Sequence, residues 1–455
     1  MSVTSIFINQ RRQQSAQVEK ILFYGIFGLL LFGPLAFGAV EPWSIFVLET
    51  GTTLLFLLWL SKQLIDGKVN VRWNPVFLPM GIFGLLVVAQ IVFRRTAYRH
   101  DTVSLGLLYL ALGTLCFLST QTLVRSAQAR RLALIFSAYG AAVAIFALLQ
   151  GISPNGKLYW LRQPRMGGWI YGPYVNHNHY AGLMELLVPI PLIVSLTRMA
   201  APKVRAVAAA SAAVMVGTIF LSGSRGGMLA IMAELIILSA LMVKQKRGVP
   251  TAIGIGIFLS IIASMLIWVG GTQLSERIAS VGPGHTELAA DIRADINRDG
   301  LHMFFKRPIL GWGLGGFPVV YPQFRTFYTN FFINEAHDDY LQLLVEMGLL
   351  GFGTMIWFLV TLYRHAVKKL GNWPSDISGA LTLACLLGSS GILVHSFVDF
   401  NLQIPANAAL FYVMGTVAAS EPFAKPARKR RPIRTEPPEQ VFDPHEGLHQ
   451  SATNF

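Results

Sequence analysis

The sequence has few charged residues and very few cysteines. Only 13% of its 455 residues are Asp, Glu, Lys or Arg, whereas soluble domains contain about 25%. Hydrophobic residues make up 53%, and the mean hydropathy is +0.52. This composition excludes an assembly of soluble domains and favours a protein with many membrane spans. Cys116 and Cys385 lie in apolar runs with neither metal-ligand spacing nor a disulfide framework, so we expect both to pack as small apolar side chains.

Nucleotide-binding motifs are also missing. No Walker motif occurs in the chain. The glycine-rich run Pro308–Phe317 does not follow a parallel-strand unit, which excludes a dinucleotide-binding fold. We expect this run to form a sharp loop, and we expect neither a bound nucleotide nor a nucleic-acid partner.

Long apolar runs, in contrast, are abundant. A helix needs about 20 apolar residues to span a bilayer, and the chain holds twelve candidates. We therefore predict an all-α, polytopic integral membrane protein with about twelve transmembrane helices and a large periplasmic loop that contains short helices. The candidate spans are 21–40, 44–65, 76–93, 103–124, 132–150, 180–198, 204–222, 226–243, 250–270, 338–363, 378–397 and 404–420.

These runs also divide the chain into segments. Between and around the spans lie an N-terminal segment, two insertions and a basic, Pro-rich tail that we expect to be disordered. The predicted segments are 1–20, the N-terminal segment; 21–270, nine spans with an insertion near 151–179; 271–337, the large loop; 338–420, the last three spans; and 421–455, the tail.

The distribution of Lys and Arg predicts the orientation, because cytoplasmic loops are enriched in both. With the N-terminus in the cytoplasm, 24 of the 37 Lys and Arg residues are cytoplasmic, and an even span count returns the tail there. Both insertions then face the periplasm.

Eleven of the 13 outer basic residues are Arg. Since guanidinium binds phosphate oxygens through two hydrogen bonds, this excess predicts phosphate binding; pairing with lipid headgroups or loop carboxylates is the alternative.

His337 is the strongest candidate for catalysis. It ends the large polar loop and comes directly before an apolar helix, where a titratable side chain is costly. Helical spacing places Gly348 and Gly351 on its face, and small residues there let a neighbouring helix approach closely. Asp338 and Asp339 follow in the first turn, where one of them is expected to orient the imidazole. A histidine that caps a helix at the membrane interface is the alternative.

Two other motifs join or open spans. Ser222–Gly227, with the sequence Ser-Gly-Ser-Arg-Gly-Gly, leaves almost no loop between two spans. It predicts either an anion-binding nest with Arg225 or a tight glycine turn whose arginine reaches the interface. His177 and His179 open the sixth span. No Cys and few carboxylates accompany them, so we expect a polar helix entry or a contact with an acceptor substrate rather than a metal site.

Several other ionisable residues lie inside or beside predicted helices. His395 and Asp399 are four residues apart near the end of a span and are expected to pair with each other. A carboxylate inside a span needs an Arg or hydroxyl partner, which we expect for Glu185 and Glu234. Arg293 and Arg298 lie on a segment of the large loop with helical spacing.

Taken in their order along the chain, these motifs resemble those of the O-antigen ligase and polymerase superfamily. The resemblance covers roughly residues 170–405, and the remaining spans fit the twelve-helix plan of that superfamily. One departure is Asp338, where ligases usually have Asn, Ser or Gln. The matching parts are Ser222–Gly227, Arg293 fifteen residues before Pro308, the run Pro308–Phe317, His337, and His395-Ser-Phe-Val-Asp399-Phe.

The resemblance implies transfer of a polysaccharide from undecaprenyl pyrophosphate to a lipid A–core sugar at the periplasmic face of the bacterial inner membrane, with no metal or other cofactor. It implies His337 as general base and Arg225 and Arg293 as pyrophosphate ligands. A polymerase or a protein O-oligosaccharyltransferase with the same donor is the alternative. A transporter would need charged pairs deep within the spans. The candidate substrate-binding residues are Arg165, His179, Arg298, Asp338 and Asp399.

Overall fold

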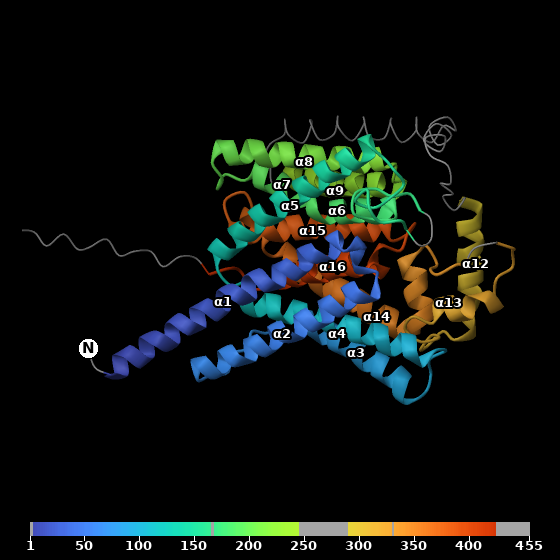
Figure 1. Ribbon diagram of the computed structural model, residues 1–455, viewed down its shortest axis with the longest axis horizontal. Coiled ribbons are helices and arrows are strands. Elements are labelled where there is room, and N and C mark those ends of the chain that lie inside the picture. Colours follow the sequence, from blue (N-terminus) through green and yellow to red (C-terminus); the bar gives the residue numbers. More distant parts are fainter. Residues whose placement is uncertain (1–2, 165–167, 245–289, 330–331, 425–455) are drawn as a thin grey trace, which may run out of the picture. The chain divides into compact units, whose positions relative to one another are not determined.

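The computed structural model describes residues 3–164, 168–244, 290–329 and 332–424. In these ranges the chain is helical and contains no β-strand, only isolated bridges (Figure 1). The protein is therefore an all-α, multi-pass membrane protein. Nine described helices, with α6 and α7 counted as one, are long and apolar enough to cross a membrane. They are α1 (Val3–Leu35), α2 (Pro42–Asp66), α4 (Arg99–Thr122), α5 (Ser126–Ile152), α6 (His177–Leu187) with α7 (Pro189–Leu196), α8 (Pro202–Ser222), α9 (Arg225–Lys244), α14 (Asp339–Val367) and α15 (Ile377–His395).

Two further predicted spans correspond to shorter apolar helices, α3 (Phe77–Val92) and α16 (Pro405–Ala419). Eleven of the twelve predicted spans thus coincide with described helices. The twelfth, 250–270, lies outside the described residues, as do 271–289 of the large loop and 425–455 of the tail. The count of twelve stays a prediction. At the N-terminus, α1 is longer than predicted and includes most of residues 1–20.

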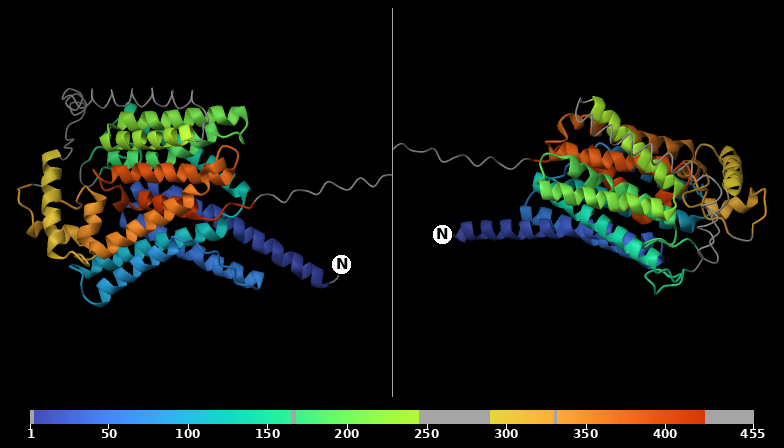
Figure 2. Two further views of the ribbon diagram at one scale, coloured as in Figure 1. Left: turned by 180° about the vertical axis from the view of Figure 1, so that it is seen from behind. Right: turned by 90° about the horizontal axis from the view of Figure 1, so that it is seen from above.

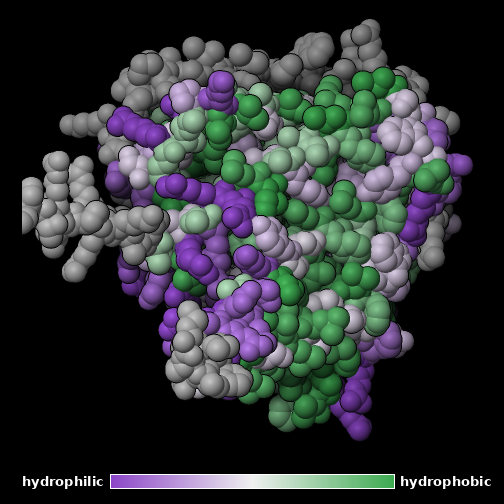
Figure 3. Space-filling view, turned by 60° about the vertical axis from the view of Figure 1, so that its left-hand side comes forward, coloured by the Kyte–Doolittle hydropathy of each residue, from purple (hydrophilic) through white to green (hydrophobic). Residues whose placement is uncertain are grey.

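The helices differ in how much of their surface is buried. The apolar stretch of α15 is 83% buried, because α6, α7, α9 and α16 pack around it. The corresponding stretches of α2 and α8 are only 28% buried. Figure 3 shows a broad hydrophobic face with hydrophilic residues along its borders, as expected for a surface that lies in lipid. Cys116 and Cys385 are both buried and unbridged, which confirms their predicted apolar packing.

Helix α14 is broken at Gly348, which has φ 63° and ψ −167°. Such a conformation is open to glycine and strained for other residues. The break leaves two carbonyls and two N–H groups without helical partners. Residues 308–313 supply the partners: Trp312 and Gly313 donate to the carbonyls of Val345 and Glu346 (3.0 and 2.9 Å). Leu349 and Leu350 donate to the carbonyls of Pro308 and Ile309 (2.8 and 3.2 Å).

The predicted sharp loop therefore inserts into a membrane helix. Gly348 does not serve a neighbouring helix, as its spacing suggested, because the backbone of Ile309 fills the place where a Cβ would lie. Two described parts of the large loop, α12 (Ala290–Lys306) and α13 (Phe317–Val320), contact α14. Figures 1 and 2 show both at one end of the helices. The loop and the break together fix the half of α14 that follows His337.

Candidate active site

His337 lies just before α14 and not on the helix. Asp338 is the N-cap, and its carboxylate accepts hydrogen bonds from two N–H groups of the first turn (2.9 and 3.0 Å). His337 has φ 54°, a left-handed conformation that costs a non-glycine residue about 1–3 kcal/mol. The prediction that His337 shares a helix face with Gly348 and Gly351 is therefore wrong. A strained turn, and not a helix, positions the imidazole.

A carboxylate from a distant segment faces this imidazole. Asp399 follows α15, and its Oδ1 lies 3.5 Å from Nδ1 of His337 and 4.0 Å from Nε2 of His179 at the start of α6. The ring of Phe400 meets both imidazoles edge to face, with centroid distances of 4.7 Å to His337 and 4.6 Å to His179. The Asp399 side chain is 1% exposed. Three predicted site residues thus meet in one buried cluster around Phe400.

Asp399 is the anionic member of this cluster. Burial alone would raise the pKa of its carboxyl. Its contact with His337, and the charges that His179 and His337 carry when protonated, outweigh burial and hold the pKa well below its usual range. The carboxylate therefore stays charged near neutral pH and favours a proton on Nδ1 of His337. The other ring nitrogen, Nε2, is then the one that can accept a proton.

One predicted arginine contacts the turn that follows α15, and the residue next to a second one packs against it. In α12, Nη1 of Arg293 donates to the carbonyl of Val398 (3.1 Å). Gly226, in the first turn of α9, packs so closely against the ring of His395 that a Cβ there would collide with it and would also crowd the side chain of Val398. Arg225 is the residue before this glycine. Segments distant in sequence thus bring the side chain of Arg293, and the backbone next to Arg225, to the turn that carries the carboxylate.

The turn between α8 and α9 uses its serine hydroxyls internally. Gly223, with φ 75°, ends α8 in the left-handed conformation. The hydroxyl of Ser222 donates to a carbonyl of α8 (2.7 Å) and accepts from the N–H of Ser224 (3.3 Å). Ser224 accepts from an N–H of the first turn of α9 (3.2 Å). Both serines are fully buried, whereas Arg225 is exposed. The tight-turn alternative fits this arrangement better than a nest whose hydroxyls bind an anion.

Buried polar contacts hold the cluster together. Asp339 accepts hydrogen bonds from the hydroxyl of Ser396 (2.8 Å) and the N–H of Leu402 (3.0 Å), which join the start of α14 to the segment after α15. Asn407 of α16 donates to the carbonyl of His179 (2.9 Å). Neither carboxylate of the first turn of α14 orients the imidazole, as we had expected, because Asp338 caps the helix and Asp339 binds these donors.

His395 has a partner other than the expected Asp399. Its Nδ1 lies 2.7 Å from Oε1 of Glu185 in α6, and both side chains are at most 1% exposed. Glu185 thus pairs with an imidazole and not with the predicted Arg or hydroxyl. Glu234 of α9 packs tightly against Gly391 of α15. The buried Glu185–His395 pair lies beside the α8–α9 turn and connects α6 with the end of α15.

The other predicted substrate-binding residues have local roles or lie outside the structure's range. Arg298 pairs with Asp295 on α12 (2.8 Å), and its side chain is 64% exposed. Asp338 acts as a helix cap. Arg165 lies outside the described residues. The cluster itself is composed of His337, His179 and Asp399, with Arg293 anchored one residue before the carboxylate.

The chemistry of this site follows from its groups. An imidazole backed by a carboxylate can accept a proton, and nearby guanidinium groups can neutralise an anionic leaving group. Within the described residues, no three His, Cys, Asp or Glu side chains are placed to hold a metal ion. Whether the reaction proceeds without a metal stays a prediction.

Sequence reasoning missed Phe400 and the Glu185–His395 pair. Phe400 directly follows Asp399 in the final motif, so an aromatic residue next to a candidate carboxylate was the available signal. No such signal links Glu185 to His395, because 210 residues separate them.

Fold and site together define a polytopic membrane protein with imidazole, carboxylate and arginine side chains gathered at one end of its helices. Residues 210–356 match a family model described as O-Antigen ligase. The resemblance of the motifs to the O-antigen ligase and polymerase superfamily is thereby confirmed. The matched range includes Arg225, Arg293 and His337, whereas Asp399 lies beyond it. No curated protein matches the chain.

Proposed function

We propose that this protein is an O-antigen ligase. It transfers a polysaccharide from undecaprenyl pyrophosphate to a sugar hydroxyl of the lipid A–core, at the periplasmic face of the inner membrane. The family match supports a lipid-linked glycan as substrate class. The charge distribution of the sequence supports the orientation, which puts the end with His337 in the periplasm and both termini in the cytoplasm.

In the proposed reaction, the acceptor hydroxyl attacks the anomeric carbon of the donor sugar. A new glycosidic C–O bond forms as the bond from that carbon to the pyrophosphate oxygen breaks. The pyrophosphate leaves with the electron pair, and Arg225 and Arg293 neutralise its charge. The hydroxyl proton passes to Nε2 of His337, while Asp399 stabilises the resulting imidazolium.

The observation that carries this proposal is the convergence at the turn after α15. His337 and Asp399 lie 3.5 Å apart, Arg293 donates to the neighbouring carbonyl, and the glycine after Arg225 packs against the same turn. A helix cap alone would leave the left-handed backbone and the buried carboxylate of this cluster without a function. His179, beside the same carboxylate, is suited to bind a substrate hydroxyl.

In vitro transfer tests the proposal. Purified full-length protein is given a lipid-linked glycan and, in separate reactions, a lipid A–core, a second lipid-linked glycan or a peptide acceptor, with and without EDTA. We expect glycan on the lipid A–core only, at equal rates with the chelator. Transfer to the second lipid-linked glycan would identify a polymerase instead, and transfer to the peptide a protein oligosaccharyltransferase. A rate abolished by EDTA would contradict the metal-independent mechanism.

A transporter would place paired charges deep within spans. The buried Glu185–His395 pair instead includes the last residue of α15 and so lies at the end of that span. It sits beside the α8–α9 turn next to the proposed site, and the family match points to glycosyl transfer. Movement of the lipid-linked glycan across sealed vesicles, without any acceptor, would favour transport.

A further inference from the structure

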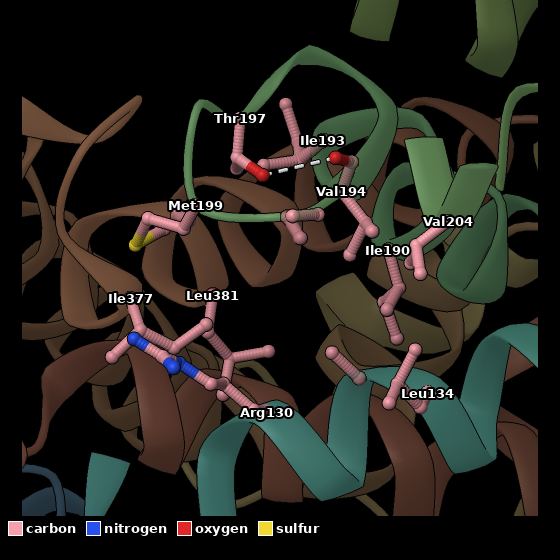
Figure 4. A pocket seen from close by; sticks show the side chains of 14 residues that line it. Arg130, Leu134, Ile190, Ile193, Val194, Thr197, Met199, Val204, Ile377 and Leu381 are labelled. Carbon is pink, nitrogen blue, oxygen red and sulfur yellow. Dashed lines mark hydrogen bonds between the residues drawn. The ribbon is translucent and has the colours of Figure 1, made fainter. Parts of the chain in front are cut away.

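A second candidate site lies at the end of the helices opposite His337. There the start of α5, the end of α7, the start of α8 and the start of α15 surround an apolar pocket (Figure 4). Its volume is about 170 Å³. A cavity of about 150 Å³ is large enough for benzene, so this pocket has room for a stretch of one lipid acyl chain.

The pocket has a buried floor and an open side. Ile193, Ala380 and Ala384 form part of the floor and are at most 3% exposed. On the rim, Leu134 is 52% exposed and Val204 is 38% exposed. Both rim residues belong to helices that are long and apolar enough to span a membrane, so we infer that the opening faces lipid. An acyl chain can then enter from the side.

One charged residue, Arg130, lines this apolar pocket. Figure 4 shows its guanidinium beside Ile377, across from Met199. Within the described part of the chain, no hydrogen bond or ion pair involves this guanidinium. Its neighbour Arg131 instead donates to the hydroxyl of Tyr24 (2.9 Å). Arg130 is therefore the arginine available to a ligand in the pocket.

The surroundings of the pocket are strongly basic. Asp376 lies next to the pocket residue Ile377, but its carboxylate is already used, because it caps α15 by accepting the N–H of Gly379 (3.1 Å). Such a basic rim around an apolar pocket between spans suits an anionic lipid headgroup and has no complement for a neutral one. Two of the basic residues at this end, Arg205 and Lys369, donate to carbonyls (2.9 and 2.7 Å). The basic residues at this end of the helices are Arg130, Arg131, Arg198, Lys203, Arg205, Lys368 and Lys369.

We propose that this pocket binds an anionic glycerophospholipid of the surrounding membrane, with one acyl chain in the cavity and the phosphate against Arg130. The orientation proposed above puts this lipid in the cytoplasmic leaflet. The site is separate from the transfer reaction, since its residues come from the helix ends opposite His337. Binding there joins α5, α7, α8 and α15, the four helices that line the pocket.

Lipid binding by the purified full-length protein tests the proposal. Native mass spectrometry and thermal unfolding are measured in detergent with added phosphatidylglycerol or phosphatidylcholine. We expect phosphatidylglycerol to bind and raise the unfolding temperature more than phosphatidylcholine. Arg130→Gln should weaken phosphatidylglycerol binding about fivefold, the factor expected for one basic residue beside an anionic lipid. Arg131→Gln is the matched control, because it removes the same charge from the same end.

A second variant tests the cavity. Ala384→Phe should fill the floor of the pocket and weaken the binding of both lipids. If this variant does not fold, Leu134→Gln can replace it: it places a polar group on the exposed rim and should also weaken the binding of both lipids. Equal binding by Arg130→Gln and Arg131→Gln would overturn the headgroup assignment. Equal binding of the two lipids would overturn the proposal. Binding of neither lipid would also overturn it, and would mean that the pocket is filled by the protein itself.

Discussion

Replacing Asp399 with Asn removes one charge from the imidazole cluster and changes little else. The amide keeps the size of the carboxylate and can still accept from the N–H of Phe400 (2.9 Å). It cannot stabilise an imidazolium on His337. Two unit charges about 4 Å apart interact by about 4 kcal/mol at an effective dielectric constant of about 20. The Nδ1–Oδ1 separation is 3.5 Å, with Asp399 1% and His337 12% exposed, so about 4 kcal/mol is an upper limit for this pair.

Because about 1.4 kcal/mol corresponds to a tenfold change in rate, the charge is worth at most about 10³-fold. A general base contributes about 10²–10⁴-fold in total. We therefore expect Asp399→Asn to lower kcat by about 10²–10³-fold and to change donor binding little. The assay is single-turnover transfer of labelled glycan to lipid A–core. Asp376→Asn, at the other end of α15, is the matched control, because Asn caps a helix as well as Asp does.

The pH profile provides an independent test. The pKa of Asp399 is lowered in the folded protein, so the stability from its charge is present above its unfolded value of about 3.9 and is lost only at pH values well below it. Asp399 is thus ionised throughout pH 5–8, so the loss of kcat in Asp399→Asn should be present across this whole range. A loss that disappears within the range, or a kcat within threefold of the wild type, would refute the reasoning.

Three further predictions concern the same site, and a fourth concerns the orientation of the chain. His337→Ala should lower the transfer rate about 10²–10⁴-fold while donor binding persists, and substantial activity in His337→Lys would argue for a cation in place of a base. Arg225→Lys and Arg293→Lys should each lose most activity although charge is kept, and near-normal transfer by both would show that simple charge suffices. Glu185→Gln keeps a hydrogen bond to its buried imidazole and should fold, whereas Glu185→Ala should lower the unfolding temperature and the rate together; an unaffected Ala variant would exclude a positioning role. A topology reporter fused after Gly284 should be periplasmic, and a cytoplasmic signal would overturn the orientation.

Hydropathy was sufficient to predict most of the fold. Runs of about 20 apolar residues have few alternatives in a bilayer, since backbone groups there must be satisfied within a helix. The break in α14 was not predictable in this way. A glycine inside an apolar run looks the same whether it admits a neighbouring helix or, as Gly348 does, leaves the helical conformation. The difference lies in residues 308–313, whose glycines indicated only a loop.

The sequence predicted which residues belong to the site better than it predicted which of them contact each other. Composition and motif order pointed to His337, Asp399 and Arg293, because each is costly or unusual where it stands. Helical spacing suggested that Asp399 pairs with His395, but α15 ends at His395 and the chain turns, so the carboxylate reaches His337 instead. Contacts between segments 62 residues or more apart, such as His337 and Asp399, leave no periodic trace in a single sequence.

The break in α14 also bears on the order in which the protein is made. Residues 308–313 leave the ribosome before Gly348, so the partners of the broken helix exist before the helix enters the membrane. A span that entered first would carry unpaired N–H and carbonyl groups about 15 Å from its start, at several kcal/mol for each group in lipid. Shortening the 308–313 segment should therefore impair insertion of α14 during synthesis, so that the protein is degraded in the cell before any loss of catalysis can be measured.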